Sequence, residues 1–137
     1  MNLFKIFDIS GSALSAQSVR LNTVASNLAN ADVPSATAEG VYKARHPVFA
    51  AVLRAVGNES AGAVRVTDIV ESERPPRVEY RPGHPLANEE GYVFLPAVNV
   101  VEEMADMISA SRSYQTNVEV LDTVKQLMLR TLQLGQR

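Results

Sequence analysis

The residues best suited to metal chemistry are two histidines and a pair of neighbouring glutamates. His84 shortly precedes Glu89 and Glu90, and imidazole and carboxylate groups are common zinc ligands. However, His46 and His84 each stand directly before a proline, which favours an extended loop. Two adjacent glutamates in a turn-rich stretch are typical of solvated side chains. The sequence therefore predicts no metal site and no cofactor.

Side chains that could act as nucleophiles are no better placed. The chain has no cysteine, which removes thiolate catalysis and disulfides. Ser10 and Ser12 flank Gly11 but have no base near them in the sequence. Neither a phosphate-binding glycine loop nor a nucleophile elbow is present. We therefore expect no catalytic residue and no small-molecule substrate, and the chain is predicted not to be an enzyme.

Charge and hydropathy narrow the possible partners. The 137-residue chain has a formal net charge of −2, and without a basic stripe we expect no binding to nucleic acid. No apolar run reaches the length of a membrane span. The segment LFKIF (3–7) could lie on a membrane surface, but Lys5 alone attracts anionic lipid weakly. The start of the chain lacks the features of a cleavable signal peptide. We expect no direct membrane insertion.

Hydrophobic periodicity divides the chain into three zones and predicts an α+β fold. Residues about 5–31 follow a helical period, which should end before Pro34. Residues about 36–97 contain short β-like runs between Pro and Gly turns, which indicates a small antiparallel sheet; residues 48–56 fit a short helix or a strand. A second helical stretch runs from Asn99 to about Leu134. Asn99 and Glu102 form a capping-box pattern at its start.

The second helix is too long for a compact protein of this size. About 36 residues at 1.5 Å per residue span roughly 54 Å, whereas a compact chain of this length is about 35–40 Å across. Beyond Val118 its apolar residues spread around most of the circumference. A helix that is apolar nearly all round must be buried nearly all round. We therefore expect other chains to cover it.

The first helix has an outer face without charge. Polar residues on that face have only amides and hydroxyls, which leave water at moderate cost when each finds a hydrogen-bond partner. We interpret this face as packing against another protein surface; the alternative is a solvated face that happens to lack charge. The residues concerned are Asn22, Thr23, Ser26, Asn27 and Asn30.

Two stretches also resemble a known family. LNTVASNLANAD (21–32) is similar to the N-terminal signature of the axial proteins of the bacterial flagellar rod and hook. YRPGHPLANEEGYVFLPAVN (80–99), with the long helix that follows, more specifically resembles the proximal rod proteins. The likeness covers about residues 9–35 and 64–136.

The resemblance implies a structural subunit of the basal-body rod, located in the periplasm and exported as an unfolded chain through the type III apparatus. It implies a helical, tube-forming domain of residues 1–35 and 98–137, paired as an antiparallel coiled coil. Residues 36–97 would form an outward-facing β-rich segment. Carried onto this sequence, the subunit interface would contain Leu14, Leu21, Asn27, Leu28 and Asn30, together with Tyr114, Val118, Leu121, Val124 and Met128.

The implied partners are other rod proteins, the rod–ring junction protein and copies of this chain, with the surrounding ring or bushing as a further candidate. Torque would pass through helical packing between neighbouring subunits. The alternative is a free-standing helical interaction module that does not assemble into a rod. Such a module should be a compact monomer with fully helical ends.

Overall fold

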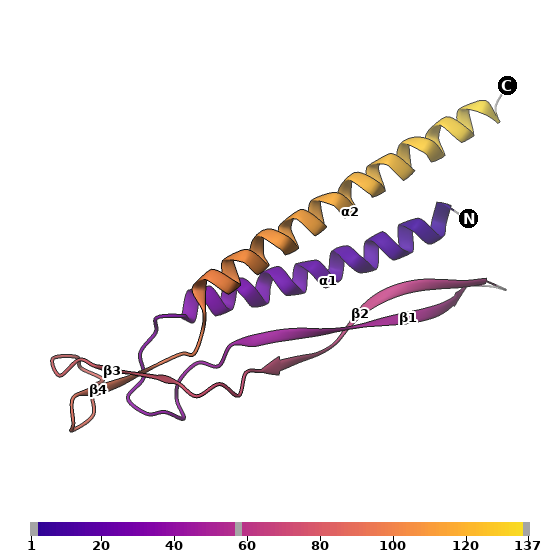
Figure 1. Cartoon of the computed structure of the whole chain (residues 1–137). Helices are drawn as coiled ribbons and strands as arrows, with labels where there is room; N and C mark the ends of the chain where they lie inside the picture. Colours follow the sequence, from indigo (N-terminus) through magenta and orange to yellow (C-terminus); the bar gives the residue numbers. More distant parts are fainter. Residues whose placement is uncertain (1–2, 57–58, 136–137) are drawn as a thin grey trace.

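Two long helices dominate the computed structural model, which describes residues 3–56 and 59–135. Helix α1 spans Leu3–Asn30 and helix α2 spans Val100–Leu134. They pair in antiparallel directions, so that both chain termini lie at the same end of the molecule (Figure 1). The predicted α+β class and the pairing of the terminal helices are confirmed.

Local signals in the sequence set the inner ends of both helices. After Asn30 the chain makes a short turn, and Pro34 keeps Val33 out of the helical region. At the start of α2 the Asn99 side chain accepts hydrogen bonds from the backbone of Val101 and Glu102. No hydrogen bond from the Asn99 N–H to the Glu102 carboxylate completes the expected capping box in the described structure, and this carboxylate lies 3.6 Å from Arg74. The cap is therefore a single-sided Asn cap.

A long β-hairpin lies along α1, on a side that α2 does not occupy (Figure 1). Strand β1 (Arg45–Val56) pairs antiparallel with β2 (Glu59–Glu71). The stretch 48–56, which the sequence left open between helix and strand, is a strand. A bulge between Val48 and Phe49 leaves Thr67 without a partner in the register, and such bulges increase the local twist of a strand.

A second, short hairpin closes the other end of the molecule. Strand β3 (Arg77–Tyr80) pairs with β4 (Tyr92–Leu95), and Ser35 forms a single bridge to Phe94. The β-rich zone is thus two separate two-stranded sheets within the described residues, and the expectation of one small sheet was wrong. An isolated hairpin is marginal in water, so β1–β2 depends on α1 for support.

The compact part of the molecule lies where the two helices meet the short hairpin. Its buried apolar residues come from the turn after α1, the following loop, β4 and the chain that leads into α2. They are Ala31, Val41, Ala44, Val93, Leu95 and Val98. The predicted division into residues 1–35 with 98–137, and 36–97, stays a prediction; its outermost residues 1–2 and 136–137 lie outside the described residues.

Candidate subunit interface

The residues considered for metal chemistry do not gather into a site. No three His, Asp or Glu side chains come together in the described parts of the chain. His84 has a local structural role, because its Nδ1 accepts a hydrogen bond from the backbone N–H of Leu86 at 3.1 Å. No helix in the described ranges is long and apolar enough to cross a membrane.

Among the described residues, Asn27 is the buried side chain with the most hydrogen bonds. It is fully buried, and its amide makes four hydrogen bonds. Its Nδ2 donates to the Arg45 carbonyl at 2.9 Å and to Glu103 Oε2 at 3.0 Å. Its Oδ1 accepts from the Tyr42 hydroxyl and the Arg45 backbone N–H, each at 2.9 Å. One side chain of α1 therefore joins α2, the loop and the start of β1.

The neighbours of Asn27 on the uncharged face of α1 are also largely covered within the chain. Thr23 is buried, and the Ser26 hydroxyl lies 3.1 Å from the Tyr42 hydroxyl. Asn30 turns back to the Ser26 carbonyl at 2.8 Å, while Asn22 remains exposed. This face is covered mainly by the chain's own loop and hairpin, and the expected packing against another protein surface stays a prediction. The sequence could not distinguish the two cases.

The predicted interface residues fall into three groups by exposure. Asn27 and Val124 are buried within the single chain. Tyr114 and Val118 are each 38% exposed. The remaining predicted residues are half-buried: Leu14, Leu21, Leu28, Asn30, Leu121 and Met128. Leu121 and Met128 share a helical face with Val124, because Val124 follows Leu121 by three residues and precedes Met128 by four. That face is the seam between the helices, and contacts of these residues with neighbouring subunits stay a prediction.

Many large apolar side chains of α2 remain uncovered outside that seam. Among the described elements, α2 contacts only α1, and its only buried residues are Glu103, Ala110 and Val124. Several large side chains on its other sides face solvent, for example Val101 at 75%, Leu132 at 66% and Leu129 at 52% exposure. The sequence-based set of interface residues omitted these positions, although the all-round apolar pattern beyond Val118 included Leu129 and Leu132.

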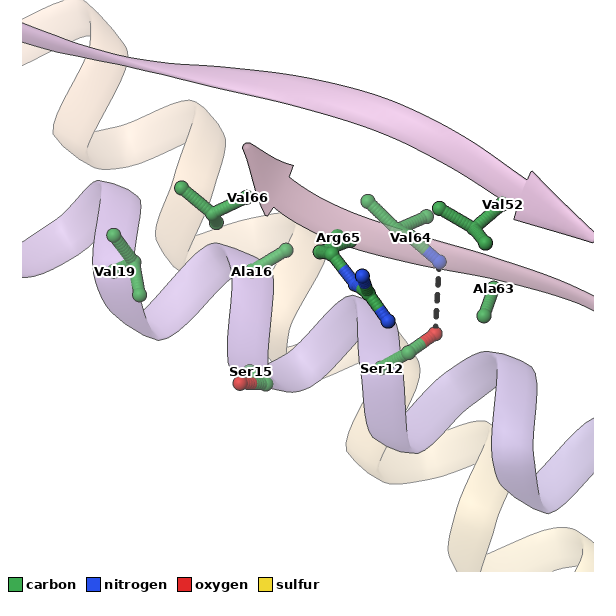
Figure 2. Close-up of a pocket in the computed structure, with 9 residues that line it drawn as sticks. All are labelled: Ser12, Ser15, Ala16, Val19, Val52, Ala63, Val64, Arg65 and Val66. Atoms are coloured by element: carbon green, nitrogen blue, oxygen red, sulfur yellow. Dashed lines mark hydrogen bonds between the residues drawn. The ribbon is translucent and has the colours of Figure 1, made fainter. Parts of the chain in front are cut away.

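A groove separates α1 from the hairpin (Figure 2). It has a volume of about 310 Å³ and is lined mainly by small and β-branched side chains. The Ser12 hydroxyl bridges it at one point, donating to the Ile9 carbonyl at 2.8 Å and accepting from the backbone N–H of Val64 at 3.1 Å. That bond consumes the serine hydroxyl and ties β2 to α1.

Comparison with known proteins identifies the molecule's family. Residues 7–37 match the family described as flagella basal body rod protein, and residues 89–134 match the C-terminal family of the flagellar basal body rod FlgEFG proteins. The flagellar basal-body rod protein FlgC of Escherichia coli O157:H7 is 54% identical, with 99% of this chain and 100% of the relative covered. This chain belongs to the FlgC family of flagellar basal-body rod proteins. The FlgC proteins of Salmonella typhimurium and Yersinia enterocolitica are 52% and 53% identical over the same shares.

The two matched regions correspond to the two helices. The first covers most of α1 and the turn that follows it, and the second covers β4 and α2. Membership of the FlgC family makes the chain a structural component of the flagellar basal body that assembles with rod components, and this agrees with the absence of catalytic motifs from the sequence.

Proposed function

We propose that this chain is a subunit of the proximal rod that transmits torque through packing of α1 and α2 against neighbouring subunits. The observation that carries the proposal is the uncovered apolar surface of α2. Exposed patches of this kind mark interaction sites in soluble proteins. A helix about 52 Å long with one partner along one side offers two further flanks to other chains.

The arrangement suits a mechanical role. A heterologous contact joins one surface of a subunit to a different surface of the next. When such contacts do not close into a ring, they generate a helical filament. The seam residues of the sequence-based set, Leu121, Val124 and Met128, would hold each helix pair rigid. The outer residues of α2, such as Leu129 and Leu132, would join one pair to the next. The partners would be copies of this chain, other rod proteins and the rod–ring junction protein, with the ring or bushing outside.

We place the assembled subunit in the periplasm, after export of the unfolded chain through the flagellar type III apparatus. The lack of cysteine supports this route, because no thiol is oxidised during passage through an oxidising space. Among its described residues the β1–β2 hairpin has no buried apolar side chain, which suits a chain that completes its fold only when it meets its neighbours.

The rival proposal is a free-standing helical interaction module. It requires a partner for α2 that is not a rod subunit and a monomer that remains stable in its absence. Family membership favours the rod. Size-exclusion chromatography with basal-body isolation separates the two: a module would never copurify with the basal body.

The decisive experiment uses a Salmonella typhimurium strain that lacks its own FlgC protein. The unmodified chain should restore basal bodies and swimming. Leu129→Asp should abolish both, because assembly would bury an unpaired charge, at a cost of about 3–5 kcal/mol. The isolated subunit should keep its fold, since Leu129 is already half exposed.

The matched control is Gln126→Asp, which adds the same charge at an exposed position on the polar part of the same helix. It should swim normally. If the Leu129→Asp strain swam fully and had normal amounts of basal bodies, this part of α2 would not lie in a subunit interface, and the proposal would be wrong.

A further inference from the structure

The groove between α1 and β1–β2 has the properties of a receptor for a helix rather than for a small ligand. Its walls offer mostly methyl groups, and the hydroxyl of Ser12 is already used. On the α1 side it extends from Ser12 to Val19, which corresponds to about 10 Å of helix, or two turns. The hairpin wall is formed by Val52, Ala63, Val64 and Val66.

Arg65 places a positive charge beside this apolar lining. Figure 2 shows its side chain reaching from β2 toward α1. The residue is exposed, and among the described residues it makes no hydrogen bond or ion pair. Other arginines near the hairpin differ, because Arg45 pairs with Glu71 and Arg20 pairs with Asp106. The groove therefore presents small apolar side chains and one cation without a counter-ion.

A complementary surface exists on α2 of the same sequence. Val118 and Asp122 are one helical turn apart and thus share a flank. Both are exposed, and Asp122 has no ion pair with any described residue. This flank cannot reach its own hairpin, because α2 makes no contact with β1 or β2 in the chain.

We infer that the groove receives α2 of a neighbouring copy, with Val118 against the apolar lining and Asp122 beside Arg65. This inference rests on the proposed rod assembly and assigns two of its contacting surfaces. The charges match, the apolar side chains match, and both surfaces lie outside the intramolecular seam. An acid and a base paired at the edge of an apolar contact fix register and exclude wrong alignments.

Disulfide trapping tests the contact directly, because the natural chain contains no cysteine. The variant Ala63→Cys/Val118→Cys places one thiol on the groove and one on the docking flank. Basal bodies from a complemented strain, oxidised and run on non-reducing gels, should show cross-linked multimers. A disulfide needs Cα atoms within about 7 Å, which the two residues could reach only between copies. The control is Ala63→Cys/Thr116→Cys, whose second thiol lies on another side of α2.

Multimers from the Val118 pair and not from the Thr116 pair would support the inference. No multimers, or equal amounts from both pairs, would overturn it. Normal swimming in that case would leave the proposed rod function intact, because swimming of the complemented strain reports assembly independently of this contact.

Charge exchange gives a second readout if the cysteine variants fail to assemble. Arg65→Asp and Asp122→Arg should each lower the yield of basal bodies about tenfold, and the combined variant should recover to within about twofold of the unmodified chain. Arg112→Asp, at another exposed arginine, is the control and should change little. A combined variant no better than the worse single variant, or two single variants with normal yield, would overturn the pairing.

Discussion

The buried side-chain amide of Asn27 joins α1 to α2 and to the start of the hairpin through hydrogen bonds. Both N–H groups and both lone pairs of its oxygen are satisfied, by groups from the stretch 42–45 and from α2. The buried Glu103 has no cationic partner among the described residues and depends on this amide. Fully satisfied buried networks specify a single arrangement, because any slip leaves a polar group without a partner.

We therefore expect Asn27→Ala to cost about 3 kcal/mol of unfolding free energy, since several buried groups lose their partner at once. Urea unfolding of the purified chain, followed by circular dichroism, measures the change. Asn22→Ala is the control on the exposed side of the same helix and should stay within about 0.5 kcal/mol. Equal midpoints for both variants would contradict the central role given to this amide.

Gly91 is the one described residue whose backbone requires glycine. Its φ is +85°, and a Cβ there would approach the Tyr80 ring to 2.9 Å and Pro82 Cβ to 3.1 Å. Gly91→Ala should therefore destabilise the short hairpin by about 1–3 kcal/mol. Thermal unfolding would measure this. Gly83→Ala lies in the same loop, where a Cβ meets no atom within 4 Å, and should be nearly neutral. A neutral Gly91→Ala would show that the turn can rearrange.

At the scale of the elements, the start of α2 depends on its cap. Asn99 Oδ1 accepts a hydrogen bond from the Val101 N–H at 3.1 Å. The Glu102 carboxylate lies near Arg74 and does not accept from the Asn99 N–H. We expect Asn99→Ala to lower stability by about 1 kcal/mol, while Asn99→Ser retains most of it, because serine also caps helices. Guanidinium unfolding of the two variants provides the comparison. If both variants lost the same amount, the cap would not be the cause.

The sequence predicted the elements whose signals are local. Apolar periodicity, Pro34 and Asn99 placed both helices within a few residues of their observed ends. It did not predict the length of β1–β2, because VFAAVLRAV (48–56) is compatible with either secondary structure until α1 supplies a supporting surface. Nor could it say which partner covers an uncharged polar face. Asn27 and Val124 were predicted as subunit-interface residues from the sequence, but the single chain already buries both of them.

At the scale of the whole molecule, the balance of covered and uncovered surface varies along the helix pair. Near the base, α1, α2, the loop and β4 enclose a core. Along the shaft, α2 has α1 alone as a partner, and no described residue after Val124 is buried. A helix whose apolar side chains lack cover gains little to offset the loss of chain entropy. The subunit should thus be stable at its base and open at its far end until neighbours arrive.

Hydrogen exchange on the isolated chain at low concentration tests this gradient. Backbone amides of Leu127–Leu134 should exchange at least about tenfold faster than those around Ala110, because the distal turns open without unfolding the rest. In assembled basal bodies the difference should shrink, since neighbouring subunits would cover the same turns. The Leu129→Asp variant is the matched control. As a free subunit it should show the same difference in exchange rates along α2, and because it does not assemble, its distal amides should gain no protection from exchange. Uniform slow exchange to the end of α2 in the dilute monomer would mean that the chain shields its own apolar surface. It would then need no neighbours to complete its fold.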